Sequence, residues 1–138
     1  MDAELSAWRG RHLPGVFRFD FSRGSLEELE KIVLERFQTR EEVTEQKESA
    51  FIQGAIRYLG ESLVRPGYAF WRYQDQEVEN AVDNPYHKNP YIKSYAAQGD
   101  SVSMVPLSVL RLAVRDRAGE HLVKAYKKVR RNYEQNNH

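Results

Sequence analysis

Residues 51–73 read FIQGAIRYLGESLVRPGYAFWRY, and this stretch decides the fold that we expect. Its first part predicts a helix, because apolar residues recur at helical spacing up to Arg65. Pro66-Gly67 ends that helix, since the residue before a proline disfavours helical geometry. The following residues predict a strand, with alternate side chains on opposite faces. Because both faces carry bulky side chains, we expect a central strand.

Gly54 and Gly60 interrupt the helical pattern, and each costs about 1 kcal/mol relative to alanine. Close packing is the simplest interaction that offsets this cost. The two glycines are six residues apart, which is about 600° of helical rotation, so they lie on different faces. We therefore expect Gly60 to admit the sheet and Gly54 to admit another helix.

Outward from this stretch, residues 16–21 alternate like a strand, and Ser25 with Glu28 forms a capping-box pattern at the start of a helix over residues 26–37. The helix that contains residues 51–65 is expected to begin between Glu41 and Ser49 and to end before Pro66. Short strands are expected at residues 91–95 and 102–105, followed by a helix beginning at Pro106 and another around residues 122–133.

These elements predict a single α+β domain over residues 1–138, in the order β-α-α-β-β-β-α-α. We expect a small antiparallel sheet of about four strands, with helices packed mainly on one face. Residues 1–14 are expected to form an N-terminal arm, and residues 134–138 a frayed tail.

Composition narrows the class of protein. The chain has 138 residues, of which 41% are hydrophobic and 30% charged, and it has no cysteine. One folded domain is therefore expected, without disulfides or thiolate metal sites. Because residues 1–18 lack a signal-peptide pattern and no long apolar run is present, we expect a cytoplasmic protein with no membrane contact.

Charged residues on the central helix form one candidate site. Glu61 has Arg57 and Arg65 four residues away on either side. Surface ion pairing explains this spacing, with a few tenths of a kcal/mol per pair. The other interpretation is a binding cluster beside Trp71 that holds an anion or a carboxylate of a partner.

Histidines and serines give little support for catalysis. The four histidines lack metal-ligand spacing, so no metal site is expected, and no motif predicts a cofactor. His87 has acidic, basic and tyrosine neighbours, as many surface loops do. No nucleophile elbow or phosphate-binding glycine loop is present. We leave the possibility of an enzyme open and expect none.

Tyrosines alternate with basic residues between residues 84 and 95, and the candidate binding residues there are Tyr86, His87, Tyr91 and Tyr95. This composition is typical of protein-binding surfaces and also of surfaces that stack nucleic-acid bases. Residues 111–131 hold eight basic and two acidic residues, which keeps nucleic-acid binding through the last helix open.

The chain resembles a group of small bacterial, chiefly actinobacterial, proteins of no known activity. The resemblance rests on residues 25–30, on the Tyr58-Leu-Gly-Glu61 helix leading to Trp71, and on Val105-Pro-Leu107 with the helix after it. It implies that the Tyr-Leu-Gly-Glu helix packs on a small antiparallel sheet. A looser likeness to immunity-type proteins of bacterial competition systems is an analogy of size and architecture.

Our leading hypothesis is a non-enzymatic protein-binding domain with an immunity-like or regulatory role, whose main partner is another protein. The alternative is a small-molecule enzyme or ligand-binding domain that uses Arg57, Glu61 and Arg65. A third hypothesis is nucleic-acid binding through the basic C-terminal helix. A homo-oligomer also stays open, because Gly54 and Gly60 suit a contact between subunits as well as an internal one.

Overall fold

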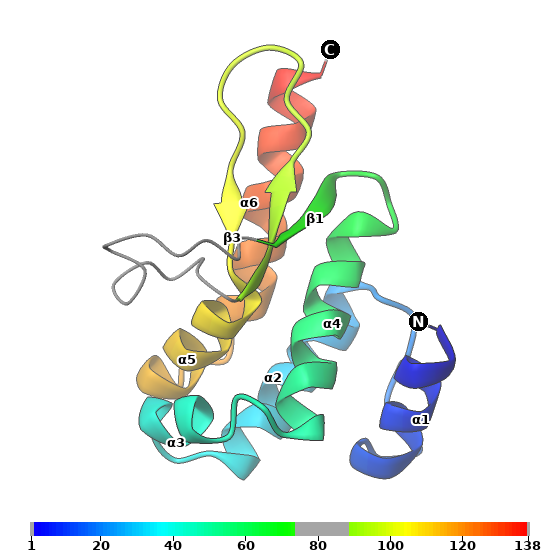
Figure 1. Ribbon diagram of the computed structural model, residues 1–138, viewed down its shortest axis with the longest axis vertical. Helices are drawn as coiled ribbons and strands as arrows, with labels where there is room; N and C mark the ends of the chain where they lie inside the picture. The colour runs from blue at the N-terminus through cyan, green and yellow to red at the C-terminus, as the bar shows by residue number, and fades with distance from the viewer. Residues whose placement is uncertain (1, 74–88, 138) are drawn as a thin grey trace.

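The computed structural model describes residues 2–73 and 89–137. Helices and a three-stranded antiparallel sheet form an α+β fold, as predicted, with one strand fewer than expected. In Figure 1, α6 stands behind the sheet, and most of the other helices lie below it. The elements are α1 (Asp2–His12), α2 (Arg23–Arg36), α3 (Arg40–Glu45), α4 (Ala50–Val64), β1 (Ala69–Tyr73), β2 (Pro90–Ser94), β3 (Ser103–Met104), α5 (Pro106–Asp116) and α6 (His121–Asn136).

Helix α4 lies at the centre of the core. Ser49 caps its first turn by accepting a hydrogen bond from the backbone N–H of Ile52, at 3.2 Å. Its buried residues contact elements on several sides, and they are Phe51, Ile52, Ala55, Ile56, Tyr58, Leu59, Gly60, Glu61, Ser62 and Leu63. The prediction for the two glycines is confirmed, because a Cβ on Gly60 would overlap the Trp71 ring and a Cβ on Gly54 would overlap the ring of Trp8 in α1.

Residues 16–21 do not form a strand, which corrects the sequence prediction. Val16 is 88% exposed, and Phe21 has a φ angle of 61°. The alternating aromatic residues surround a helix side chain instead, since the rings of Phe17, Phe19 and Phe21 lie 4.6–5.6 Å from the ring of Tyr58. The Tyr58 hydroxyl accepts a hydrogen bond from the backbone N–H of Phe21 at 2.9 Å.

The helices also differ from the prediction in four places. Helix α2 begins at Arg23 with Ser22 as its N-cap, and Ser25 accepts a hydrogen bond from the Tyr58 hydroxyl at 2.7 Å instead of capping. The region from Glu41 to Arg65 forms two helices, α3 and α4. The expected N-terminal arm is the packed helix α1, and the expected frayed tail is helical to Asn136 and bound to residues 95–98.

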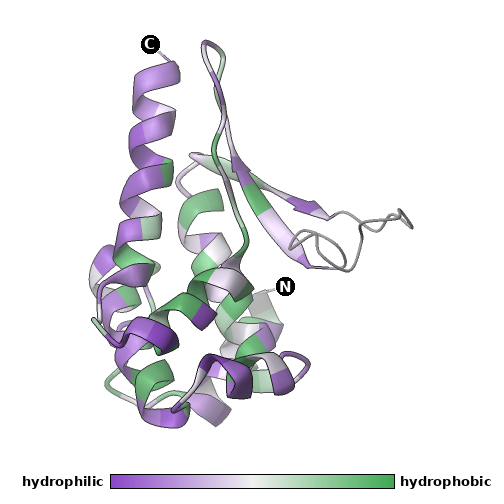
Figure 2. Cartoon of the chain, turned by 90° about the vertical axis from the view of Figure 1, so that its left-hand side faces the viewer, coloured by the Kyte–Doolittle hydropathy of each residue, from purple (hydrophilic) through white to green (hydrophobic). Residues whose placement is uncertain are grey.

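Within the part of the chain that the structure describes, the strand order is β1-β2-β3, so β2 is central there and β1 is an edge strand, contrary to the prediction for β1. Trp71 pairs with Ile92, and Ile92 pairs with Met104. The face that carries Ala69, Trp71 and Ile92 turns toward the helices. In the side view of Figure 2, the described helices lie on one side of the sheet.

Two long-range contacts join α2 to the C-terminal helices α5 and α6. Glu30 of α2 is fully buried, and its Oε1 accepts a hydrogen bond from the backbone N–H of Leu122 at 2.8 Å. A carboxylate there satisfies a free donor at the N-terminus of α6 and interacts favourably with the helix dipole. The Arg117 guanidinium donates to the carbonyl groups of Leu34 and Phe37 at the end of α2.

Candidate functional site

Trp71 is held in place by two consecutive residues of α4. Gly60 leaves room for the indole ring against the helix backbone. The indole Nε1 donates a hydrogen bond to Glu61 Oε2 at 2.7 Å. A charged acceptor makes this hydrogen bond stronger than one between neutral groups. Gly60 and Glu61 together fix where β1 crosses α4.

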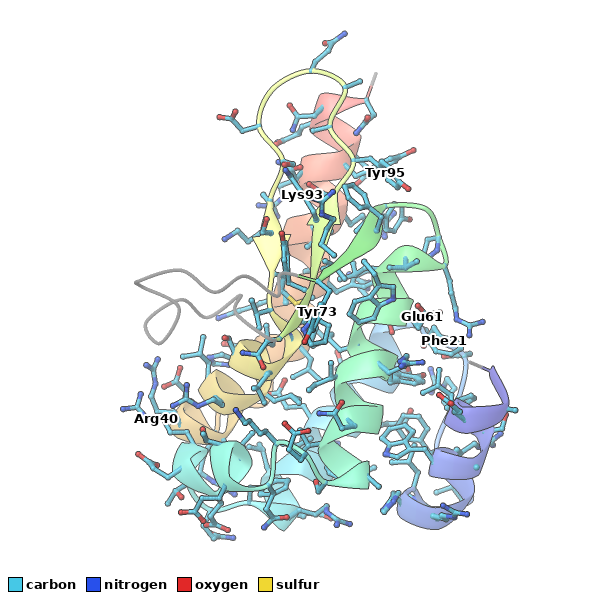
Figure 3. The ribbon with its side chains drawn as sticks, viewed as in Figure 1. Phe21, Arg40, Glu61, Tyr73, Lys93 and Tyr95 are labelled. Carbon is cyan, nitrogen blue, oxygen red and sulfur yellow. The ribbon has the colours of Figure 1, made fainter. Side chains whose placement is uncertain are left out.

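Glu61 holds the Trp71 ring in place through this hydrogen bond, and its side chain is only 6% exposed. Its Oε1 lies 3.4 Å from Arg65 Nε, and the guanidinium carbon of Arg65 lies 4.0 Å from the ring centroid of Phe21. Figure 3 shows Glu61 and Phe21 on the side of α4 that faces α1. The Glu61 carboxylate is therefore occupied by two partners within the fold.

Arg57 does not join Glu61 and Arg65 in one cluster. Its Nη1 lies 3.6 Å from Glu4 Oε2 of α1, and both side chains are well exposed. Such an exposed pair contributes little to stability. Instead, Arg57 lies beside Trp71 at the rim of a groove.

This α4–β1 groove runs between the exposed side of α4 and the ends of β1 and β2. It comprises two adjoining cavities of about 330 and 410 Å³. Four residues line both cavities, namely Gln53, Ile56, Tyr73 and Pro90. Arg57, Trp71 and Arg72 complete the first cavity, and Lys47, Glu48, Asn89 and Leu107 complete the second.

Tyr73 is the most exposed aromatic residue of the groove. It is 60% exposed, although it is a large, partly apolar side chain at the end of a strand. Figure 3 shows it beside α4 at the lower end of the sheet. Exposed aromatic residues that line a groove are typical of interaction sites.

The outer edge of β1 beside the groove carries backbone groups that have no backbone partner in residues 2–73 and 89–137. Tyr95 N–H donates to Tyr68 C=O, and Ser94 N–H donates to Val102 C=O. Because the two sides of an antiparallel strand alternate, Phe70 and Arg72 direct their backbone groups to β2, whereas Trp71 and Tyr73 direct theirs away from it. Among the described residues, no backbone hydrogen bond to these outward groups is found.

The charges that line the groove are mainly positive. Lys47, Arg57 and Arg72 are cationic, and Glu48 is the acidic residue among those that line it. Arg72 forms no ion pair within the described ranges 2–73 and 89–137. The groove thus combines apolar surface, strand-edge hydrogen-bonding groups and an excess of cations.

Tyr91 and Tyr95 lie on the opposite face of the sheet from this groove. Ile92 and Ser94 are buried toward the helices, so the alternate residues of β2 face outward. Tyr95 packs on Phe70 there, with ring centroids 4.8 Å apart. Figure 3 shows Lys93 and Tyr95 higher on the sheet than Tyr73. Tyr86 and His87 lie outside the described residues.

The chain matches no family model, no curated protein and no solved structure. In residues 2–73 and 89–137, no group of three or more His, Asp or Glu side chains could hold a metal ion. None of the described helices is long and apolar enough to cross a membrane.

The structure thus brings together Arg57 and Trp71 from the predicted residues, and adds Tyr73, Arg72 and Ile56, which the sequence analysis did not select. The sequence signal that was available is the position of Tyr73 at the end of an alternating strand pattern. The signal was incomplete, because alternation does not tell which strand lies at the edge of a sheet.

Proposed function

We propose that this chain is a non-enzymatic protein-binding domain with an immunity-like or regulatory role, and that its partner binds in the α4–β1 groove. The observation that carries the proposal is the exposed Tyr73 beside Trp71, on a strand edge whose outward backbone groups are unpaired among the residues that the structure describes. Tyrosine and tryptophan are enriched among the residues that dominate protein interfaces.

The groove favours an extended segment of the partner. An extended peptide can add to a free strand edge through main-chain hydrogen bonds, with alternate side chains in the neighbouring groove. Tyr73 offers the exposed apolar contact, and the largely buried Ile56 and Leu107 form the floor of the groove. The excess of cations favours acidic side chains on the peptide. We therefore infer a peptide that alternates apolar and acidic residues.

The alternative of an active or ligand-binding site built on Glu61 has no comparable support. Glu61 is buried between Trp71 and Arg65, and Arg57 pairs with Glu4. We assign Glu61 the role of a positioning residue for Trp71.

Selection from random linear peptides displayed on phage tests the proposal. We expect selected peptides to share an apolar and acidic pattern. Their affinity, measured by isothermal titration calorimetry, should fall by about tenfold or more in Tyr73→Ala, because an aromatic anchor of this kind contributes about 1–2 kcal/mol or more. Arg57→Glu should weaken the same peptides.

Tyr95→Ala is the matched control, because it removes an exposed tyrosine from the opposite face of the sheet. It should leave the affinity unchanged. If Tyr95→Ala weakened the selected peptides and Tyr73→Ala did not, the binding surface would be the outer face of the sheet. Failure to select any peptide that depends on Tyr73 would argue against the α4–β1 groove.

A further inference from the structure

The basic residues of the last two helices are divided by the fold into two groups. Three of them are engaged with other groups: Arg115 with Asp116 at 2.7 Å, Arg117 with the carbonyls that end α2, and Arg130 with Glu134 at 3.5 Å. Arg111 of α5 belongs to neither group. The second group lies along one side of α6 and comprises Lys124, which pairs with Glu120, and the residues Lys127, Lys128 and Arg131.

These four cations line a second groove, the α6 groove, with a cavity of about 350 Å³. Val102, Asn132 and Gln135 complete its lining, and no acidic residue is part of it. Lys124 pairs with Glu120 at 2.7 Å in an exposed position, where such a pair is weak. Lys127, Lys128 and Arg131 form no ion pair with any residue that the structure describes.

The segment that faces α6 across the groove, around Val102, is held to the helix by hydrogen bonds. Asn132 donates a hydrogen bond to the carbonyl of Asp100 at 2.9 Å and accepts one from the Ser94 hydroxyl. Ser94 in turn accepts a hydrogen bond from the backbone N–H of Val102 at 2.8 Å. The segment between β2 and β3 is therefore held against α6, and these hydrogen bonds fix the shape of the groove.

Helix α6 buries its apolar side, so the cations lie on its free side. Leu122, Val123, Tyr126 and Val129 are in the core. In Figure 2, the mostly hydrophilic α6 stands apart from the free face of the sheet. The α6 groove and the α4–β1 groove share no lining residue, so the two surfaces are separate.

We propose that the α6 groove binds the phosphate backbone of a single strand of nucleic acid. The cations recur every three or four residues, and Lys124 to Arg131 spans about 10 Å of helix. A row of cations in a groove suits a chain with regularly repeated negative charges. The cavity of about 350 Å³ between α6 and Val102 is of a size that suits one sugar-phosphate backbone, whereas a duplex presents two backbones on a wide rod.

No aromatic side chain lines the α6 groove. Bases therefore have no ring to stack on there, and the groove contacts phosphates without selecting a base sequence. Binding should accordingly be sequence-independent and strongly dependent on salt.

Fluorescence anisotropy with a labelled oligothymidylate of about 16 nucleotides tests this proposal. Engagement of three or four phosphates predicts a slope of about −2 to −3 in a plot of log affinity against log salt concentration. The affinity should then fall roughly 30-fold between about 50 mM and about 200 mM salt. Lys127→Glu/Lys128→Glu/Arg131→Glu should abolish this binding.

The matched control is Arg11→Glu/Lys31→Glu/Arg40→Glu, which makes the same change in net charge at exposed positions on other helices. It should retain most of the binding. Equal losses in the two triple variants would show attraction by net charge alone and would overturn the site. Absence of binding at about 50 mM salt would overturn it as well.

Two competitors decide the class of ligand. A duplex of the same length should compete more weakly than the single strand, and so should poly-glutamate at equal charge concentration. If the duplex competed better, the assignment to a single strand would be wrong. If poly-glutamate competed equally, the α6 groove would be a site for acidic polypeptides instead.

Discussion

At the scale of single residues, Gly60, Glu61 and Trp71 determine where the edge strand lies. Gly60 allows the indole to approach the helix, and Glu61 accepts its N–H. Both contacts are made between residues of the protein itself. The glycine that weakens the helix locally is thus required by the packing of β1 on α4.

Gly60→Ala should destabilise the protein by about 1–3 kcal/mol, although alanine favours a helix by about 1 kcal/mol over glycine. The added Cβ overlaps the Trp71 ring, so the ring has to move and its hydrogen bond to Glu61 is strained or lost. Urea unfolding measures the change in the free energy of unfolding.

Gly10→Ala is the control for this substitution. Gly10 is also helical, and no atom lies within 4 Å of its added Cβ. It should be neutral or stabilising by up to about 1 kcal/mol. Equal effects of the two substitutions would contradict close packing at Gly60.

Tyr58 gives a prediction for alkaline pH. It is fully buried, and burial raises the pKa of its hydroxyl above the ordinary value of 10.0. The neutral hydroxyl therefore contributes stability that is fully present below pH 10.0 and lost as the pH rises through the folded-state pKa.

Tyr58→Phe should reduce the free energy of unfolding near neutral pH by about 1–2 kcal/mol, because it removes hydrogen bonds to Phe21 and Ser25. The variant should also lose less stability than the wild type between about pH 9 and about pH 11. Urea unfolding across this range compares the two. Parallel pH profiles would be the contradictory result.

At the scale of elements, local patterns predicted α4 and the strands β1, β2 and β3 closely, because their apolar periods match the structure. The alternation at residues 16–21 misled the prediction, since the same period serves an extended segment that surrounds Tyr58. None of the described strands lies beside this segment, and a period of two cannot show whether a pairing partner exists.

Helix α1 depends on one close approach to α4. Trp8 fits against Gly54, and its Nε1 donates to the carbonyl of Phe51 at 3.2 Å. The buried residues Leu5 and Trp8 carry the packing of α1. This contact joins residues more than 40 positions apart, so the sequence alone did not reveal that the first residues form a packed helix.

Gly54→Ala should detach α1 without unfolding the sheet, because the added Cβ overlaps the Trp8 ring. In a Trp71→Phe background, fluorescence reports Trp8 alone and should shift to the red. Limited proteolysis should cleave within residues 2–12 faster than in the Trp71→Phe parent. Unchanged fluorescence and cleavage would show that α1 docks in another way.

At the scale of the whole molecule, Glu30 and Arg117 join α2 to α6 and to the end of α5. The two proposed binding surfaces on this frame are the α4–β1 groove and the α6 groove. The sequence predicted Arg57 and Trp71 as binding residues and the last helix as basic. It also predicted β1 as a central strand, which is wrong. Strand order depends on contacts between distant residues, so the free edge of β1 could not be predicted from its own pattern.

The central claim is that β1 is a free edge that accepts an extended peptide, and amide hydrogen exchange resolved by residue tests it most directly. In the free protein, the amides of Trp71 and Tyr73 should exchange quickly, and those of Phe70 and Arg72 slowly. Adding a selected peptide should protect Trp71 and Tyr73. Bound peptide that leaves the exchange of both amides unchanged would contradict the claim.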